Sequence, residues 1–305
     1  MGCGIDYRWH GSLFTRVTER YDAPNNGKLC KKGKFGHEFL NDPAPAAIDP
    51  VKTRTQVAGL LKKAKHPVMR ISPYLCGEAI DAFLDAAARK GIPVRAAGLE
   101  KLDPRWAEVA VRKPAGCSDE EKKLILLIGD IAASNNVAFT EAFRKRRQGA
   151  AELWIAGHDD DTARRAADRV IPDVQAALAE AAASGRAVEV WVNPEEAPAR
   201  ALDSLLGLRD KVQVQLLWNS RNAGYLFVRQ GKTTHTADLL LDVGVEESAN
   251  GATRIAWGKK SGTQDLFIPM PREWWFMGRS HPTAMPPVQS GTVQADALKA
   301  VLLFD

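Results

Sequence analysis

The sequence predicts an α/β fold, in which a small N-terminal β-hairpin module is followed by a mostly parallel βαβ sheet domain. Residues 5–18 hold two short runs rich in aromatic and β-branched residues, separated by a glycine turn. From residue 51 onward, apolar strand-like runs alternate with helical patterns, as in βαβ units. Between these parts, Asn41–Pro50 contains three prolines, which is typical of a linker. We therefore expect domains at residues 1–45 and 51–305.

The N-terminal module is expected to be a hairpin. Ile5–Trp9 and Leu13–Thr18 are the predicted strands, and residues 10–12 join them. Asp22–Gly27 forms a strong turn cluster after the second strand. A module this small cannot bury a core alone, so we expect it to pack against the α/β domain or a partner.

In the larger domain, helices are expected at residues 52–65, 78–89, 137–147, 162–168 and 174–183. Strands are expected at residues 67–71, 92–96, 124–128, 152–156, 188–192, 212–218 and 300–304. The continuous apolar run Leu124–Ile128 is typical of a strand buried on both faces. Ligands of parallel sheets bind at the carboxyl ends of strands, so the loops after Ile71, Ile128 and Ala156 are candidate ligand loops.

The composition indicates an ordinary globular protein, with 305 residues of which 45% are hydrophobic and 26% charged. The net charge of +5 is spread along the chain, which favours solubility or an acidic partner surface over nucleic acid. No apolar run reaches about 18 residues, and no signal peptide is visible, so we expect no direct membrane insertion. Four scattered cysteines predict a reducing, cytoplasmic location.

Two cysteines bracket the predicted hairpin. Cys3 lies in a Gly-Cys-Gly sequence before it, and Cys30 lies in the sequence GKLCKKGKFG after it. The glycines let backbone N–H groups approach the sulfurs, and the lysines offset the negative charge of a thiolate-ligated cluster. The pattern predicts an iron–sulfur site with Cys3 and Cys30 close together as metal ligands. The alternative is a pair of isolated thiols in a fold that has lost its cluster.

This segment resembles the N-terminal cluster domain of the molybdopterin oxidoreductases, which include formate dehydrogenase catalytic subunits and the large subunit of NADH:quinone oxidoreductase. By this resemblance Cys3 and Cys30 correspond to the third and fourth family cysteines, in the family context G-x-L-C-x-K-G-R-F-G. Lys32 corresponds to the lysine between cluster and pterin, which implies an electron relay. No cysteines stand where the first two family cysteines would fall, so either the chain is missing its true beginning, or the implied 4Fe–4S cluster is incomplete, lost or completed by other groups. Cys76 and Cys117 are candidate substitutes, although a buried structural thiol is the more usual interpretation of Cys76 and an exposed thiol that of Cys117.

A second block of resemblance covers residues 124–170. In the family, a strand ending in G-x-N-P, a helix, and a strand ending near D-P-R hold the guanine nucleotide of the pterin cofactor. Here the corresponding sequences are GDIAASNN and AGHDDD, so the layout is retained but the D-P-R chemistry is absent. We therefore expect no tightly bound molybdopterin guanine dinucleotide, and the acidic run 159–161 is more typical of a helix start than of a metal site. The cofactor-binding positions that the resemblance implies are Gly33, Lys34, Gly129 and Asn135.

The resemblance implies an electron-transfer or scaffold subunit of a multi-subunit oxidoreductase, similar to a shortened complex I large subunit without a working pterin site. Two alternatives stay open. One is a molybdenum or tungsten formate dehydrogenase-like catalytic subunit or fragment, and the other is a cofactor-free structural relic that binds partner subunits. The expected partners are other subunits of a redox complex, and no catalytic residue can be assigned. We expect Trp274 or Trp275 to be exposed at an interface, because a large apolar patch usually marks one.

Overall fold

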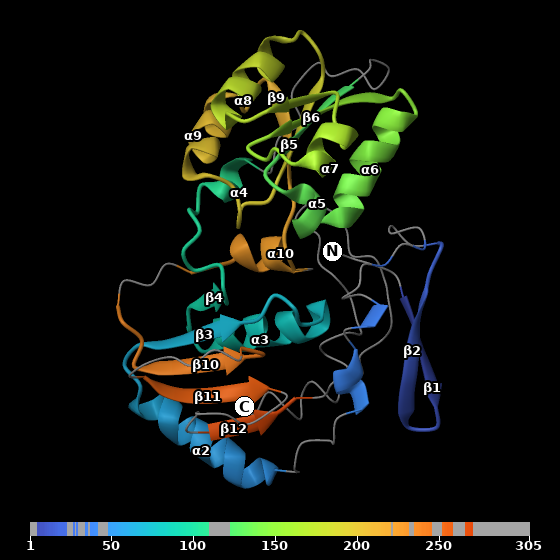
Figure 1. Cartoon of the computed structure of the whole chain (residues 1–305). Coiled ribbons are helices and arrows are strands. Elements are labelled where there is room, and N and C mark those ends of the chain that lie inside the picture. Colours follow the sequence, from blue (N-terminus) through green and yellow to red (C-terminus); the bar gives the residue numbers. More distant parts are fainter. Residues whose placement is uncertain are drawn as a thin grey trace.

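The computed structural model of the chain confirms the predicted fold class. It describes residues 5–22, 27, 29, 34–35, 37–41, 48–109, 123–220, 222–231, 235–245, 252–258 and 266–270. Within these residues an antiparallel hairpin is followed by two five-stranded parallel sheets with their helices (Figure 1). The alternation of strands and helices predicted the α/β type, but it did not show that the strands divide between two sheets. The domain boundaries at 1–45 and 51–305 stay a prediction.

The N-terminal hairpin has the predicted strands, β1 (Ile5–His10) and β2 (Leu13–Glu19). A short 3-10 helix, η1 (Glu38–Asn41), packs against β2 and forms two hydrogen bonds with it. The Asn41 side chain accepts from the Phe14 N–H (2.8 Å) and donates to the Phe14 carbonyl (2.9 Å). The core of the module is small, and its buried members are Phe14, Val17 and Leu40.

The first sheet consists of β3 (Pro67–Ile71), β4 (Val94–Ala96), β10 (Leu239–Val243), β11 (Thr253–Gly258) and β12 (Leu266–Pro269). The strand order is β12-β11-β10-β3-β4, and every neighbouring pair is parallel. Two strands come before the second sheet in the chain and three come after it. The helices α2 (Pro50–Lys63) and α3 (Gly77–Arg89) bury Val57 and Phe83 in the same core as Met69 of β3.

The second sheet consists of β5 (Lys123–Ile128), β6 (Ala151–Ala156), β7 (Arg169–Ile171), β8 (Val188–Val192) and β9 (Val212–Leu216). Its order is β7-β6-β5-β8-β9, again all parallel. Its helices are α5 (Ile131–Ser134), α6 (Asn136–Arg147), α7 (Asp161–Ala166), α8 (Val174–Ala183) and α9 (Ala199–Gly207). As predicted, β5 is buried on both faces: Leu126 joins one core cluster and Leu127 the other.

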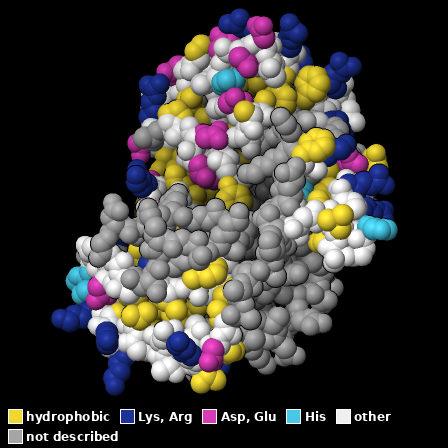
Figure 2. All heavy atoms as spheres, turned by 60° about the horizontal axis from the view of Figure 1, so that its bottom comes forward, with side chains coloured by type: hydrophobic (Ala, Val, Ile, Leu, Met, Phe, Trp, Pro, Cys, Tyr) yellow, Lys and Arg dark blue, Asp and Glu magenta, His cyan; other side chains and the backbone are white. Residues whose placement is uncertain are grey.

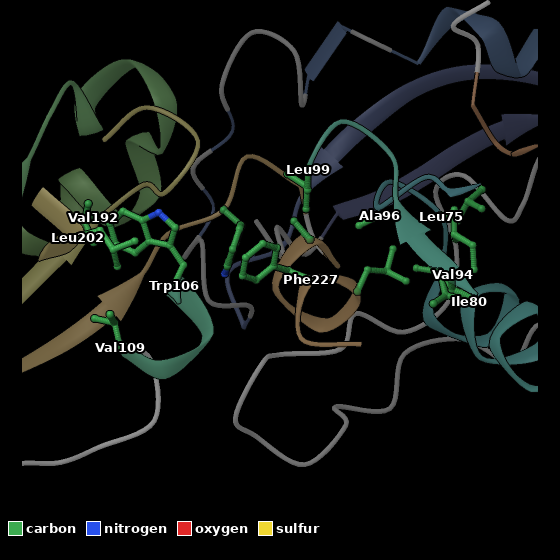
Figure 3. Close-up of a cluster of buried hydrophobic side chains, with 14 of the residues drawn as sticks. Leu75, Ile80, Val94, Ala96, Leu99, Trp106, Val109, Val192, Leu202 and Phe227 are labelled. Carbon is green, nitrogen blue, oxygen red and sulfur yellow. The ribbon is translucent and has the colours of Figure 1, made fainter. Parts of the chain in front are cut away.

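The two sheets share one continuous apolar core. The short helices α4 (Trp106–Val109) and α10 (Ala223–Phe227) lie between them (Figure 1). Figure 3 shows Trp106 on the side of the second sheet, Phe227 in the middle, and Val94 on the side of the first sheet. All three are buried members of the same cluster. The sheets are therefore packed together as one unit.

Some elements differ from the sequence prediction. The helix predicted to reach Asp168 ends at Ala166, because the Asp168 carboxylate instead accepts a hydrogen bond from the Leu153 N–H of β6 (2.9 Å). The strand predicted to reach Trp218 ends at Leu216. The elements η1, α4, α5, β7, α9, α10 and β10 to β12 were not predicted. The predicted strand at residues 300–304 lies outside the described residues.

Candidate functional site

The predicted cofactor positions Gly129 and Asn135 lie at the carboxyl end of β5. Gly129 follows the strand with a φ of +85°, a conformation that favours glycine, and its N–H donates to the Ala156 carbonyl at the end of β6 (2.9 Å). The buried Asn135 side chain accepts a hydrogen bond from the Ala138 N–H (3.2 Å) and so caps α6. Both residues therefore shape this edge of the sheet, and their contact with a cofactor stays a prediction.

Two aspartates at the same edge cap helices. Asp130 accepts a hydrogen bond from the Ala133 N–H (3.0 Å), and Asp160 accepts one from the Ala163 N–H (2.7 Å). The interpretation of the acidic run 159–161 as a helix start is thus confirmed. The bond from the Ala163 N–H is also the main reason why the pKa of Asp160 lies below its ordinary value, with a smaller contribution from His158.

His158 lies between the two capping carboxylates. Its Nε2 is 3.3 Å from Asp160 Oδ2 and 3.8 Å from Asp130 Oδ2, although neither contact is aligned as a hydrogen bond. These side chains line a cavity of about 10 Å³ together with Gly129 and Phe139. That volume holds about one water molecule. The loops after β5 and β6 meet here and leave only this small cavity between them.

Seven residues singled out in the sequence lie outside the described residues: Cys3, Cys30, Lys32, Gly33, Cys117, Trp274 and Trp275. Their roles and the proximity of Cys3 to Cys30 stay predictions. Lys34 is described, and its Nζ lies 3.0 Å from the Glu19 Oε1 at the end of β2. The pKa of the Glu19 carboxyl lies below its usual value. The main cause is a hydrogen bond from the backbone of Glu19 itself, and the second is the hydrogen bond from Lys34. Lys34 therefore anchors its segment to the hairpin, while its contact with a cofactor stays a prediction.

Cys76 is completely buried immediately before α3. It belongs to the main apolar core together with its neighbours Leu75 and Ala79. The interpretation of Cys76 as a buried structural thiol is therefore confirmed, whereas Cys117 lies outside the described residues. In the part of the chain that the structure describes, no group of three or more His, Cys, Asp or Glu side chains is arranged to hold a metal ion.

A polar cluster that was not predicted from the sequence lies at the carboxyl ends of β8 and β9. The Nδ2 of Asn193, after β8, donates to the Oδ1 of Asn219, after β9 (2.8 Å). The Asn193 Oδ1 accepts from the Glu195 N–H, and the Glu195 carboxylate accepts from the Asn219 N–H (both 3.0 Å). The available signal was an asparagine directly after a strand, in the sequences VNP and WNS.

Asn222 connects this end of the second sheet to the first sheet. It is fully buried, its N–H donates to the Pro73 carbonyl (3.2 Å), and its Nδ2 donates to the Leu75 carbonyl (2.6 Å). Tyr74, in the same loop after β3, is half exposed, and the pKa of its hydroxyl is raised by burial and then by the nearby Glu195. The loop after β3 thus meets the loops after β8 and β9 of the second sheet. The loops after β5 and β6 meet each other instead.

Comparison with known families supports the N-terminal resemblance. Residues 1–42 match the family described as the molybdopterin oxidoreductase Fe4S4 domain. The N-terminal module is of the molybdopterin oxidoreductase type. The match to this Fe4S4-type module ends before α2 begins, so it concerns the module and not the two parallel sheets.

Similarity over the rest of the chain comes from solved structures. None of the curated protein sequences matches this chain. A similar chain occurs in the crystal structure of the formyltransferase/hydrolase complex FhcABCD from Methylorubrum extorquens in complex with methylofuran. The TM-score is 0.55 at 15% identity, and the alignment covers 86% of this chain and 96% of that one. At this identity the likeness shows a shared fold alone, and it extends well beyond the Fe4S4-type module.

Proposed function

We propose that this chain is a scaffold or electron-transfer subunit of a multi-subunit oxidoreductase-type complex, similar to a shortened complex I large subunit without a working pterin site. The Fe4S4-type module supports descent from oxidoreductase subunits. The likeness in fold to one chain of a formyltransferase/hydrolase complex supports a place in an assembly. Of the two roles, we favour the scaffold.

The small cavity at the edge of β5 and β6 supports a chain without a working pterin site, which the scaffold and the electron-transfer roles share. In a parallel sheet this edge is where a nucleotide would bind. Here Asp130 and Asp160 cap helices, His158 lies between them, and the remaining cavity is about 10 Å³. We infer that this edge does not hold the guanine nucleotide of a pterin cofactor, and no reaction step through that group is derived for this chain.

Electron transfer is the second candidate role, and it depends on the match of the Fe4S4-type module. The matched segment contains Cys3 and Cys30, and thiolates are the usual ligands of such clusters. A 4Fe–4S cluster takes four ligands, so a complete site would need two more from elsewhere. By the family resemblance, Lys32 would then relay electrons from the cluster.

The proposed partners are other subunits of the complex, and the proposed location is the cytoplasm. Four scattered cysteines in 305 residues give no disulfide framework, which supports a reducing compartment. As a separate finding, none of the helices in the described ranges is long and apolar enough to cross a membrane.

Metal analysis of the complex, purified anaerobically through a tag on this chain, distinguishes the candidates. The scaffold role predicts neither iron nor molybdenum or tungsten in stoichiometric amount. Electron transfer predicts iron alone, with an electron paramagnetic resonance signal that Cys30→Ser abolishes and the matched Cys117→Ser retains. Iron together with molybdenum or tungsten would support the formate dehydrogenase-like alternative. A chain that purifies without partner subunits would contradict the whole proposal.

A further inference from the structure

The hairpin arm, formed by β1, β2 and the turn between them, exposes apolar side chains at its tip. Seven large hydrophobic side chains are exposed in the described part of the chain, and four of them belong to the Fe4S4-type module: Trp9, Leu13, Tyr21 and Phe35. Trp9 pairs with Phe14 on the side of the small core, whereas Leu13 pairs with His10 on the outer side. With Trp9 46% and Leu13 54% exposed, both faces of the tip are apolar. An exposed apolar surface of this kind usually marks an interaction site.

The outer face of the arm carries two arginines directly opposite each other. Arg8 on β1 pairs with Arg16 on β2, and both side chains are exposed. Like charges in this arrangement destabilise a hairpin. In the described part of the chain, neither arginine forms an ion pair. The neighbouring charges compensate each other instead: Arg20 pairs with Asp22 and lies near Asp6, and Lys34 pairs with Glu19.

We propose that the hairpin arm inserts into a groove of a partner protein subunit that is lined by carboxylates and apolar side chains. Arg8 and Arg16 would pair with the carboxylates, while Trp9 and Leu13 would contact opposite walls of the groove. This inference rests on the proposed function, because it requires a partner subunit. Figure 2 shows, at its right side, Lys, Arg, His and hydrophobic side chains gathered together over the hairpin.

The chemistry of the arm favours a protein partner. Tryptophan and arginine are enriched at the centres of protein interfaces, because the indole buries a large area and the guanidinium binds a carboxylate through two hydrogen bonds. The two arginines that form no ion pair among the described residues are too few for the several phosphate contacts typical of nucleic-acid binding. A two-stranded hairpin with a small core is only marginally stable, so docking would also stabilise the arm.

Zero-length cross-linking in the intact complex tests where the arm lies. The substitutions Arg8→Lys and Arg16→Lys keep the charge and add an amine that a carbodiimide joins to a touching carboxylate. We expect mass spectrometry to find cross-links from both positions to Asp or Glu residues of one partner subunit. The matched control is Arg54→Lys on the exposed face of α2, which should give no cross-link to that subunit.

Charge reversal tests whether the contact contributes to assembly. Arg16→Glu should weaken retention of the partner subunit about tenfold or more, measured by native mass spectrometry over a salt series. The new carboxylate would lie opposite Arg8 and stabilise the hairpin by charge attraction. Misfolding of the hairpin would therefore not explain a loss of the partner subunit. Replacing the cross-linked partner carboxylate by lysine should restore retention. Trp9→Ala should also weaken assembly, whereas the controls Arg54→Glu and Val51→Ala on α2 should not.

The outcomes separate this inference from the proposed function. A partner subunit that co-purifies, gives no cross-link to the arm and is retained by Arg16→Glu would overturn the inference and leave the proposed function standing. A chain that purifies alone would contradict both. Cross-links to a second copy of this chain would overturn the inference, because the groove would not belong to a different subunit. The inference would also be overturned if the complex bound vesicles of phosphatidylcholine and phosphatidylserine, or RNA, and Arg16→Glu abolished that binding.

Discussion

Replacing Asp242 with asparagine is expected to destabilise the first sheet strongly, because Asp242 is a carboxylate shared by two arginines. It lies on the central strand β10 and is completely buried. Arg70 on β3 donates two hydrogen bonds to it, of 2.7 and 2.8 Å. Arg254 on β11 donates to the same carboxylate and to the Val245 carbonyl (2.8 Å). The cluster therefore ties β10 to both of its neighbours.

The size of the effect follows from burial. Only 15% of the Arg70 side chain and 7% of the Arg254 side chain are exposed. Asparagine has nearly the same shape as aspartate, so the substitution opens no cavity and its effect is electrostatic. Removing one partner of a buried ion pair costs about 3–5 kcal/mol, because it leaves the other charge buried without compensation. At about 1.6 °C per kcal/mol for a chain of 305 residues, the melting temperature should fall by about 5–8 °C.

Urea and thermal unfolding followed by circular dichroism measure this loss. The matched control is Asp203→Asn, which removes an exposed carboxylate that bonds Arg105 (2.9 Å). Exposed pairs of this kind contribute little, so the control should unfold almost like the unchanged protein. If Asp242→Asn and Asp203→Asn lowered the unfolding midpoint equally, the reasoning from burial would be refuted.

Three further outcomes are expected. Trp106→Ala should destabilise the protein by about 3–5 kcal/mol and separate the unfolding of the two sheets in calorimetry, because this buried indole lies in their shared core; a single unchanged transition would contradict that. The Tyr225 hydroxyl donates to Asp81 (2.6 Å), and burial followed by this bond raises its pKa to about 12 from the usual 10.0. The folded state therefore holds this proton more tightly. Its contribution to the free energy of unfolding is present below pH 10 and is lost between about pH 10 and 12. In urea unfolding, Tyr225→Phe should flatten this decrease of the free energy of unfolding with pH. Mass spectrometry of denatured extracts should find no pterin guanine dinucleotide, and finding one would show that the edge at β5 and β6 opens.

Patterns along the chain were enough to predict the local elements and several of their environments. Leu124–Ile128 is continuously apolar, and it forms a strand buried on both faces because two helical layers cover it. The acidic run before α7 is a helix start because Asp160 satisfies an N–H that the helix leaves unpaired. The hairpin at residues 5–19 followed from short-range pattern and turn chemistry. In each case the deciding interactions join residues that are close in sequence.

The division of the strands between two sheets and the meeting of particular loops depend instead on long-range packing. β10 pairs with β3 across most of the chain, and Asp242 bonds Arg70 from 172 residues away. Asn222 reaches the Leu75 carbonyl across 147 residues, and nothing in the sequence around either residue marks that contact. Periodicity fixes which face of a strand is buried, but it does not identify the neighbouring strand, because pairing depends on the packing of many distant side chains at once. For the same reason the sequence named the loops after β5 and β6 only as candidate ligand loops, whereas packing brings His158 and two capping aspartates together there around a small cavity.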